Sequence, residues 1–383
     1  MNNEATYWIA LSHLPKWGYG KINNLIVKFF HEEKMTIEEF FHLPLSVWSS
    51  KFQLNSKEIA DLQKSKSELA NNAFFAENLV SQGYELIPIT SPEYSKTLKQ
   101  NLKSSLAPTL LYVKGNKQIL QEKSIAIVGS RAAEEQSLAF TDNIAKLASK
   151  DFKVVVSGFA KGVDKQALDS AIKHKGQSII VLPQGITTFN SGFKKYYKQI
   201  VDGDVLVLST FHPKSAWSIG LAMARNPIIY GLADEIFVAE SSEKGGTWSG
   251  VIDGLKKGRK IFVRQPEENE RNANDILIEK GAIAVDYNGV ENKKTIYSDQ
   301  TNIKLLVHES VINNDNIYER ILEIFKETPL SAKEILEKTK LDWTSKKLLS
   351  FLVKMDEIQK FKKGSTNLYT LKSKQIQQPT LFG

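Results

Sequence analysis

The sequence predicts an α/β fold with a doubly wound, mostly parallel sheet, and two observations support this prediction. Short apolar runs rich in β-branched residues recur along the middle of the chain, and each ends at a small residue or a polar turn. Stretches long enough to form helices separate these runs. Strands that alternate with helices in this way require parallel pairing through right-handed crossovers, which places helices on both faces of the sheet.

A helical domain is expected ahead of the sheet, over residues 1–81. Apolar residues recur at helical spacing from Ile22 to Phe30. The preceding segment 14–20 has alternating glycines between two helical stretches, which is similar to the hairpins of helix-hairpin-helix and sterile-alpha-motif modules. Such hairpins either direct backbone N–H groups at DNA phosphate or simply pack. Trp17 stands where a tight hairpin needs a small residue, so we expect packing or protein contact here.

The sheet domain is expected over residues 82–286, and each apolar run within it is expected to form one strand. The expected strands are residues 86–89, 108–115, 124–129, 154–157, 178–185, 205–209, 235–240 and 260–263. The helical stretches between them include residues 167–174. The main α/β units are expected to begin just ahead of the strand at 124–129.

Two of these strands end in turns that are suited to bind an anion. The residues of the two turns are Gly129, Ser130 and Arg131 in the first, and Gly158, Phe159, Lys161 and Gly162 in the second. In a parallel sheet such turns lie at the carboxyl edge, where the next helix presents unpaired N–H groups. Because Arg131 and Lys161 add positive charge beside these N–H groups, we expect the two turns to bind phosphate. The glycine spacing matches neither a dinucleotide fingerprint nor a Walker loop.

Further polar groups are expected along the same edge. A turn over residues 223–229 and a loop after the strand at 235–240 supply most of them, and a helix before the strand at 205–209 supplies two lysines. These candidates are Arg225, Asn226, Lys244, Gly245, Gly246, Thr247, Lys194 and Lys195. Two alternatives stay open: Arg225 forms a surface salt bridge, or Gly245 and Gly246 form the tip of a flexible loop.

Bulk composition narrows the function classes. The chain has 383 residues, of which 42% are hydrophobic, and its formal net charge of +8 fits a polyanionic partner. Cysteine is absent and the six histidines form no ligand-spaced pair, so we expect no disulfide, no metal site, no cofactor and no catalytic residue. The N-terminus lacks the pattern of a signal peptide and no apolar run has membrane-spanning length, which predicts a cytoplasmic protein without membrane contact.

The C-terminal part is expected to contain a linker, a small domain and a tail. Residues 287–314 have the polar composition of a linker. Residues 315–372 show three helices followed by a hairpin, which is a winged-helix-like pattern, with Lys346 and Lys347 on the third helix. In the flexible tail 373–383, the residues Gln378, Leu381 and Phe382 resemble the short peptide that docks on the DNA sliding clamp.

Four motifs in order resemble those of the DNA-processing protein A family (DprA, also called Smf). They are Val-Gly-Ser-Arg at 128–131, Ser-Gly-Phe-Ala-Lys-Gly-Val-Asp at 157–164, Arg-Asn-Pro-Ile-Ile-Tyr-Gly-Leu-Ala-Asp at 225–234, and Asn-Asp-Ile-Leu-Ile-Glu-Lys-Gly-Ala at 274–282. The resemblance covers the sheet domain and the order of the flanking domains. Several loop residues depart from the family pattern, namely Thr187, Phe189, Asn190, the segment 210–213, Pro227 and the segment 244–248, which indicates a diverged member.

The resemblance implies an extended Rossmann-like domain that binds single-stranded DNA, forms a homodimer and has no known turnover. It also implies protection of incoming single strands and their hand-over to the RecA recombinase in natural transformation. By position, Ser130, Arg131 and Lys161 would contact backbone phosphate. Phe159, Phe189 or Phe193 could offer a face on which a base stacks.

Two other functions remain open from the sequence. The same turns could bind a small nucleotide-derived ligand, as in Rossmann-like sensors or phosphoribohydrolases, with Asp164, Glu240 or Glu243 as the carboxylate beside the sugar. Alternatively, the chain could be an adaptor, with its terminal modules recruiting partners and the sheet serving as a scaffold.

Overall fold

The computed structural model divides the chain into two compact units, Met1–Asn292 and Lys293–Gly383. The residues it describes are 4–292, 321–325, 329–339, 341, 343, 345–352, 355, 357–363 and 366–372. Most of the expected linker, the tail 373–383 and the side chains of Lys346 and Lys347 lie outside the described residues.

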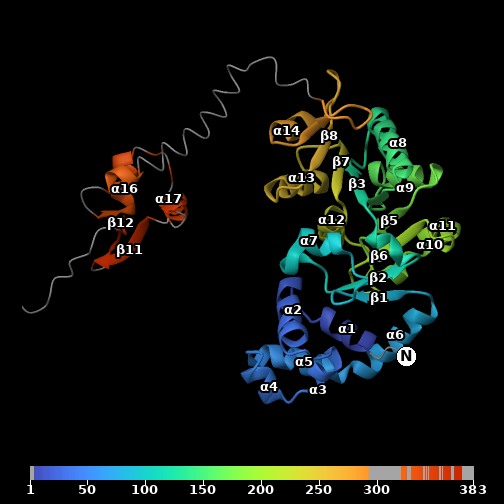
Figure 1. Cartoon of the computed structure of the whole chain (residues 1–383), viewed down its shortest axis with the longest axis horizontal. Coiled ribbons are helices and arrows are strands. Elements are labelled where there is room, and N and C mark those ends of the chain that lie inside the picture. The colour runs from blue at the N-terminus through green and yellow to red at the C-terminus, as the bar shows by residue number, and fades with distance from the viewer. Residues whose placement is uncertain are drawn as a thin grey trace, which may run out of the picture. The chain divides into compact units, whose positions relative to one another are not determined.

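Helices form the N-terminal part of the first unit (Figure 1). They are α1 (Glu4–Ser12), α2 (Tyr19–Ile26), the π-helix η1 (Val27–Glu32), α3 (Ile37–His42), α4 (Leu45–Ser50), α5 (Ser56–Ser67) and α6 (Leu69–Ser81). The periodic residues Ile22, Leu25, Ile26 and Phe29 are all buried, as their helical spacing requires. One hydrophobic core spans these helices and the sheet. The domain limit at residue 81 therefore stays a prediction.

A nine-stranded sheet in the order β1-β2-β6-β5-β4-β3-β7-β8-β9 forms the centre of the unit. Its strands are β1 (Glu85–Pro88), β2 (Leu110–Lys114), β3 (Ser124–Gly129), β4 (Val154–Ser157), β5 (Ser178–Val181), β6 (Val205–Ser209), β7 (Glu235–Glu240), β8 (Ile261–Arg264) and β9 (Ile283–Val285). Every pair from β6 to β9 is parallel, whereas β1–β2 and β2–β6 are antiparallel. The predicted mostly parallel α/β sheet is confirmed.

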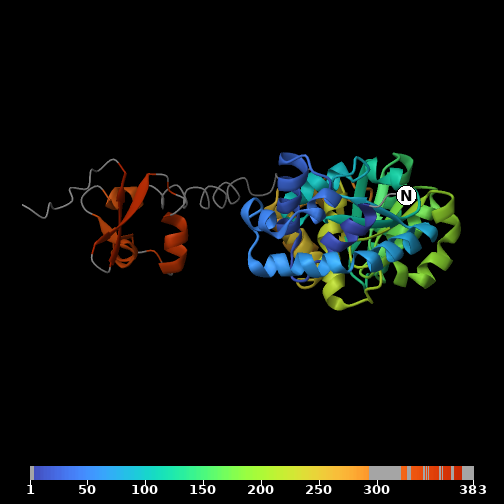
Figure 2. The ribbon, with the colours of Figure 1, turned by 90° about the horizontal axis from the view of Figure 1, so that it is seen from below.

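Helices cover both faces of this sheet (Figures 1 and 2). The connecting helices are α7 (Lys96–Leu106), η2 (Lys117–Gln121), α8 (Glu135–Lys150), α9 (Val163–Lys173), η3 (Ile186–Thr188), α10 (Asn190–Lys195), α11 (Tyr197–Val201), α12 (Ile219–Leu232), α13 (Gly246–Lys256) and α14 (Asn274–Glu279). Along β3, Ile125 and Ile127 join the core beneath α8 and α9, while Ala126 and Val128 join the core beneath α12 and α13. This double burial explains why the strand sequences are continuously apolar.

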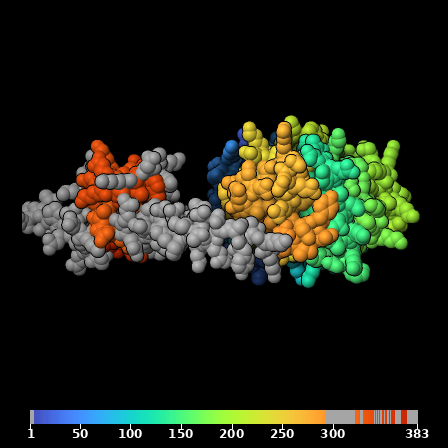
Figure 3. All heavy atoms as spheres, turned by 90° about the horizontal axis from the view of Figure 1, so that it is seen from above, coloured from blue at the N-terminus to red at the C-terminus, as the bar shows by residue number. Residues whose placement is uncertain are grey.

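Two expectations about the sheet domain are corrected by the structure. The segment 223–229, expected as a turn, lies within α12, which tolerates Pro227 in its interior. Residues 287–292, expected in the linker, attach to the sheet unit, because Asn292 donates from its backbone N to the carbonyl of Ala284 and Tyr287 packs on Phe140 of α8. Figure 3 shows this orange segment against the green α8 region.

The described part of the second unit contains helices and a small antiparallel sheet. Its elements are β10 (Leu330–Ser331), α16 (Ala332–Thr339), α17 (Ser345–Leu352), β11 (Ile358–Lys363) and β12 (Thr366–Leu371), with strand order β10-β12-β11. Ser331 and Glu334 form reciprocal hydrogen bonds at the start of α16, the pattern of a capping box. The winged-helix-like identity of this unit stays a prediction.

Candidate nucleic-acid interface

The two glycine turns meet at the carboxyl edge of the sheet. They follow β3 and β4, which are parallel neighbours. The backbone N of Val163 donates to the carbonyl of Ser130 over 3.2 Å, and the N of Ser130 donates to the carbonyl of Glu240 over 3.0 Å. Gly162 has a φ of +83°, and a Cβ there would lie 2.8 Å from the carbonyl carbon of Arg131. Only glycine permits this close approach between the two turns.

Arg131 and Lys161 line one hollow, which we call the cation cavity. It has a volume of about 260 Å3, and its lining is Arg131, Phe159, Ala160, Lys161, Pro183, Gln184, Phe189, Trp217, Ala222 and Arg225. Both Arg131 and Lys161 are exposed. Within the described part of the chain neither forms an ion pair with a carboxylate. Their charge is therefore available to an anionic ligand.

Arg225 forms part of the floor of this cavity and is not one of its exposed cations. Its side chain is 4% exposed, its Nη1 donates to the carbonyl of Val181 over 2.8 Å, and its Nη2 lies 3.5 Å from Oδ2 of Asp164. Burial raises the pKa of the Asp164 carboxyl, and the neighbouring Arg225 guanidinium opposes that rise. Gly158 makes room for the pair, because a Cβ there would overlap the guanidinium.

A second hollow of about 430 Å3, the loop cavity, lies between the β3 turn, α12 and the loop 241–247. Lys244, Gly245, Gly246 and Thr247 all line it, as do Gly129, Ser130, Arg131 and Asn226. The loop turns into α13 at Gly246, so the first N–H groups of an eleven-residue helix face this region. Thr247 also donates from its hydroxyl to the carbonyl of Gly129 over 3.1 Å, which joins the loop to the β3 turn.

Lys194 and Lys195 stand apart from both cavities. Both are exposed at the end of α10, and neither lines a cavity described above. Nζ of Lys195 lies 2.8 Å from the hydroxyl of Tyr196 and 3.4 Å from Oδ1 of Asp169. The tyrosine ring is 5.9 Å from the ring of Phe159. Lys195 therefore lies beside Tyr196, whose ring neighbours Phe159 of the cation cavity.

The aromatic residues of the cation cavity differ in what they offer a ligand. Phe189 is 5% exposed, and the rings of Phe159 and Phe193 pack against it at 4.9 and 5.5 Å. Trp217, by contrast, is 52% exposed. Its loop is joined to the loop after β5, because the hydroxyl of Thr187 donates to the carbonyl of Pro213 over 2.6 Å. The sequence analysis missed Trp217, although a tryptophan in a polar segment before a helix was a usable signal.

Sequence analysis also missed the buried network that holds the loop 241–247. The Asn274 carboxamide accepts from the N of Ser241 over 2.9 Å and donates to the carbonyls of Ala239 and Arg264 over 3.1 and 2.8 Å. Arg264 in turn forms a two-pronged ion pair with Glu270. The only available signal was the asparagine of the motif at 274–282, and its partners cannot be located without the fold.

Two other features are absent from the described part of the chain. No group of three or more His, Asp or Glu side chains in this part of the chain has the geometry to hold a metal ion. No described helix combines the length and the apolar character that crossing a bilayer requires.

Comparison with known proteins places the site in context. The family model "DNA recombination-mediator protein A" matches residues 85–296. Among curated relatives, DNA processing protein DprA of Streptococcus pneumoniae is 33% identical over 157 residues, covering 41% of this chain and 55% of the relative. The Bacillus subtilis protein of the same name is 29% identical over 186 residues, covering 48% of this chain and 61% of the relative. This chain thus spans somewhat more than half the length of either.

A solved structure has the same fold. The crystal structure of S. pneumoniae DNA processing protein A matches with a TM-score of 0.55 and 25% identity, covering 74% of this chain and 95% of that one. All four motifs noted in the sequence fall within the segment that the family model matches.

Proposed function

This chain belongs to the DNA recombination-mediator protein A family, and on that premise we propose that it is a non-catalytic protein that binds single-stranded DNA at the two cavities. One observation carries the proposal. Arg131 and Lys161 share the cation cavity, both exposed and both without a carboxylate partner among the described residues. Two such cations beside a floor of backbone N–H groups suit consecutive phosphates of a polynucleotide.

Trp217 supplies the base contact in this proposal. It lines the same cavity as the two cations and exposes half of its surface, whereas Phe189 is enclosed by its neighbours. Stacking on an aromatic face requires an unpaired base, so it favours single strands over duplex. We assign the strand's phosphates to Arg131 and Lys161, and one of its bases to Trp217.

Salt dependence tests the proposal directly. Two neutralised phosphates predict a slope of log K against log salt near −1.4, at about −0.7 per phosphate for a single strand. Arg131→Ala and Lys161→Ala should each reduce that slope by about 0.7 and weaken binding. Fluorescence anisotropy of a labelled oligothymidylate at four salt concentrations, with the matched duplex in parallel, gives both quantities.

The chain offers a matched control for charge removal. Lys150 is exposed at the end of α8, which leads from the carboxyl end of β3 to the amino end of β4, so it lies at the opposite edge of the sheet. Lys150→Ala should leave the slope and the affinity unchanged. Binding that does not respond to salt, or an Arg131→Ala protein that behaves as wild type, would refute the proposal.

The alternative of a nucleotide-processing site gains no support from the carboxylates. Asp164 is engaged with Arg225, and Oε2 of Glu240 accepts from the backbone N of Glu134 over 3.0 Å. Glu243 is exposed on the loop 241–247 and does not line the loop cavity. None of these three carboxylates is both unengaged and part of the cavity lining, so binding without turnover is the simpler function.

We extend the proposal to partners on the strength of family membership. The bound strand would be protected and handed to the RecA recombinase in natural transformation, by a protein that acts as a homodimer in the cytoplasm. Sedimentation of the purified chain tests the dimer. A RecA filament-assembly assay with and without the chain tests the hand-over. Deleting residues 378–383 tests clamp docking through Gln378, Leu381 and Phe382, the feature on which an adaptor function depends.

A further inference from the structure

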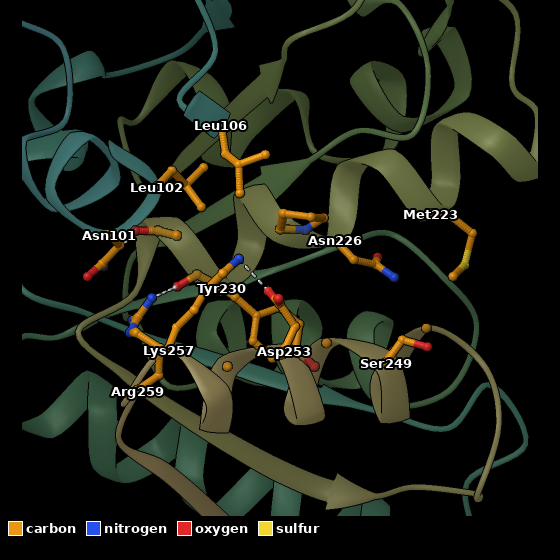
Figure 4. Close-up of a pocket in the computed structure, with 15 residues that line it drawn as sticks. Asn101, Leu102, Leu106, Met223, Asn226, Tyr230, Ser249, Asp253, Lys257 and Arg259 are labelled. Carbon is orange, nitrogen blue, oxygen red and sulfur yellow. Dashed lines mark hydrogen bonds and ion pairs between the residues drawn. The ribbon is translucent and has the colours of Figure 1, made fainter. Parts of the chain in front are cut away.

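A third hollow lies between α7, α12 and α13, and we call it the α7–α13 groove. Its volume is about 290 Å3, which falls near the lower end of cavities that hold small organic molecules. Figure 4 shows Leu102 and Leu106 of α7 on one side, Asn226 and Tyr230 of α12 at the back, and Ser249 of α13 on the opposite side.

The groove is continuous with the two cavities of the proposed DNA site. It shares Met223, Asn226, Tyr230 and Gly246 with the loop cavity. The loop cavity in turn shares Arg131, Ala160, Ala222 and Arg225 with the cation cavity. All three hollows therefore follow α12, whose fourteen residues extend about 21 Å at about 1.5 Å per residue. A strand seated in the first two hollows meets the third as it continues along the helix.

The charged side chains of the groove already have partners in the fold. Nζ of Lys257 lies 2.6 Å from Oδ2 of Asp253, as the dashed line in Figure 4 marks. Both Nη atoms of Arg259 donate to backbone carbonyls, one to Tyr230 over 2.9 Å and the other to Ala233 over 2.5 Å. Lys257 is paired with a carboxylate and both Nη atoms of Arg259 are engaged by carbonyls, so the groove differs in chemistry from the cation cavity.

The remaining lining suits a flat, uncharged ring. Leu102, Leu106, Met223 and Pro227 supply apolar walls, and Leu106 and Met223 are 41% and 45% exposed at the mouth. The carboxamide of Asn226 lies at the junction with the loop cavity and has no hydrogen-bond partner within the described part of the chain. A carboxamide offers a donor and an acceptor together, which is the pairing that the edge of a nucleobase presents.

We propose that the α7–α13 groove is a nucleobase-binding subsite, occupied by a base of the strand whose phosphates lie in the neighbouring cavities. The inference rests on the proposed function. It adds a second base contact, at the end of α12 away from the phosphate contacts of Arg131 and Lys161. Apolar contact with Leu106 and a hydrogen bond to Asn226 would hold the base, while the Asp253–Lys257 pair excludes a phosphate.

Two variants of the full chain test this assignment. Leu106→Ala removes an exposed apolar wall, and Ser249→Phe fills the groove from the exposed face of α13. Leu147→Ala on α8 is the matched control, because Leu147 is 36% exposed and lines none of the three hollows. The probes are an oligothymidylate and an abasic deoxyribose-phosphate polymer of the same length, each measured by anisotropy. Equal unfolding midpoints establish that the variants are folded.

Both groove variants should weaken oligothymidylate binding by about fivefold or more, the low end of what one stacked base contributes. They should bind the abasic polymer as wild type does, and Leu147→Ala should match wild type on both probes. Groove variants that equal wild type on oligothymidylate overturn the subsite, and so do variants that instead reduce self-association, because the groove is then a protein interface. The separate failure of the DNA proposal is recognised by an Arg131→Ala protein that loses no affinity for either probe.

Discussion

Replacing Gly158 with alanine should break the buried ion pair that underlies the cation cavity. A Cβ at this position would lie 2.5 Å from Cζ of Arg225 and would overlap Nη1 of Arg225 and Oδ2 of Asp164. Carbon atoms normally approach one another to about 3.5–4.0 Å. Arg225 cannot yield by a small shift, because its Nη1 is also bound to the carbonyl of Val181.

The geometry indicates which of two costs in unfolding free energy applies to Gly158→Ala: that of overpacking, or that of separating a buried ion pair. Overpacking that leaves local contacts intact costs about 1–3 kcal/mol of unfolding free energy. Separating a buried ion pair costs about 3–5 kcal/mol, because each charge is left uncompensated. Both charged groups are buried and both are overlapped by the new methyl group. We therefore expect Gly158→Ala to lower the free energy of unfolding by about 3 kcal/mol or more.

Urea unfolding at neutral pH measures this loss, with two comparisons. Gly220→Ala is the control within α12, because the nearest atom to a Cβ there is Oγ of Ser218 at 3.8 Å, so it should be neutral or slightly stabilising. In an Arg225→Ala background, Gly158→Ala should cost clearly less than in wild type, because the overlap with the guanidinium is gone and only the overlap with Oδ2 of Asp164 remains. If Gly158→Ala lowers the free energy of unfolding only slightly in the wild-type background, or equally in the two backgrounds, the role assigned to the Asp164–Arg225 pair is refuted.

Three further predictions concern stability. Burial lowers the pKa of His13 from 6.5 to about 3, so the folded state resists its protonation. The stability that the neutral His13 side chain gives the folded state is complete above about pH 6.5 and is lost as the pH falls toward 3. Unfolding free energies at pH 7 and pH 4.5 should therefore differ by about 2–3 kcal/mol more in wild type than in His13→Gln, and parallel pH profiles would contradict this. Asn274→Leu leaves the buried N–H of Ser241 without its acceptor and should cost at least about 2 kcal/mol in urea unfolding, whereas a loss below about 1 kcal/mol would show that the loop has another support. Thr36→Ala removes the capping box with Glu39 at the start of α3 and should lower the unfolding free energy by about 1 kcal/mol, with an unchanged midpoint as the contrary result.

Local pattern was sufficient to predict the parallel strands β3 to β8. The runs at β3, β4, β6 and β7 are apolar on both faces because helices cover both faces, and that property is visible in the sequence. The edge strand β9 was missed because it has only three residues, of which two are half-buried. The antiparallel attachment of β2 to β6 joins segments almost a hundred residues apart, and no local pattern records such a pairing.

The site was predictable only where backbone geometry determines it. The meeting of the two glycine turns follows from the parallel neighbours β3 and β4. Arg225 was assigned to a turn because the Arg225-Asn226 pair stands just ahead of an apolar stretch, yet the structure places both residues inside α12. Whether Arg225 faces solvent or the interior depends on the orientation of α12. That orientation is set by packing of Ile228 and Ile229 into the core. Trp217 and the groove likewise depend on how loops and helices meet.

The motif residues divide into two groups with different physical constraints. Buried ones such as Arg225 and Asn274 can change only together with their partners, because a buried charge or polar group left alone destabilises the fold by several kcal/mol. Exposed ones such as Arg131 and Lys161 can be replaced singly with stability changes within about 0.5 kcal/mol. Stability therefore restrains the floor of the site and leaves the exposed surface of the cavities to be set by the ligand. A chain can thus keep the four motifs while its loops depart from the family pattern. It follows that Arg131 and Lys161 are the positions where loss of binding and loss of stability should be most clearly separated.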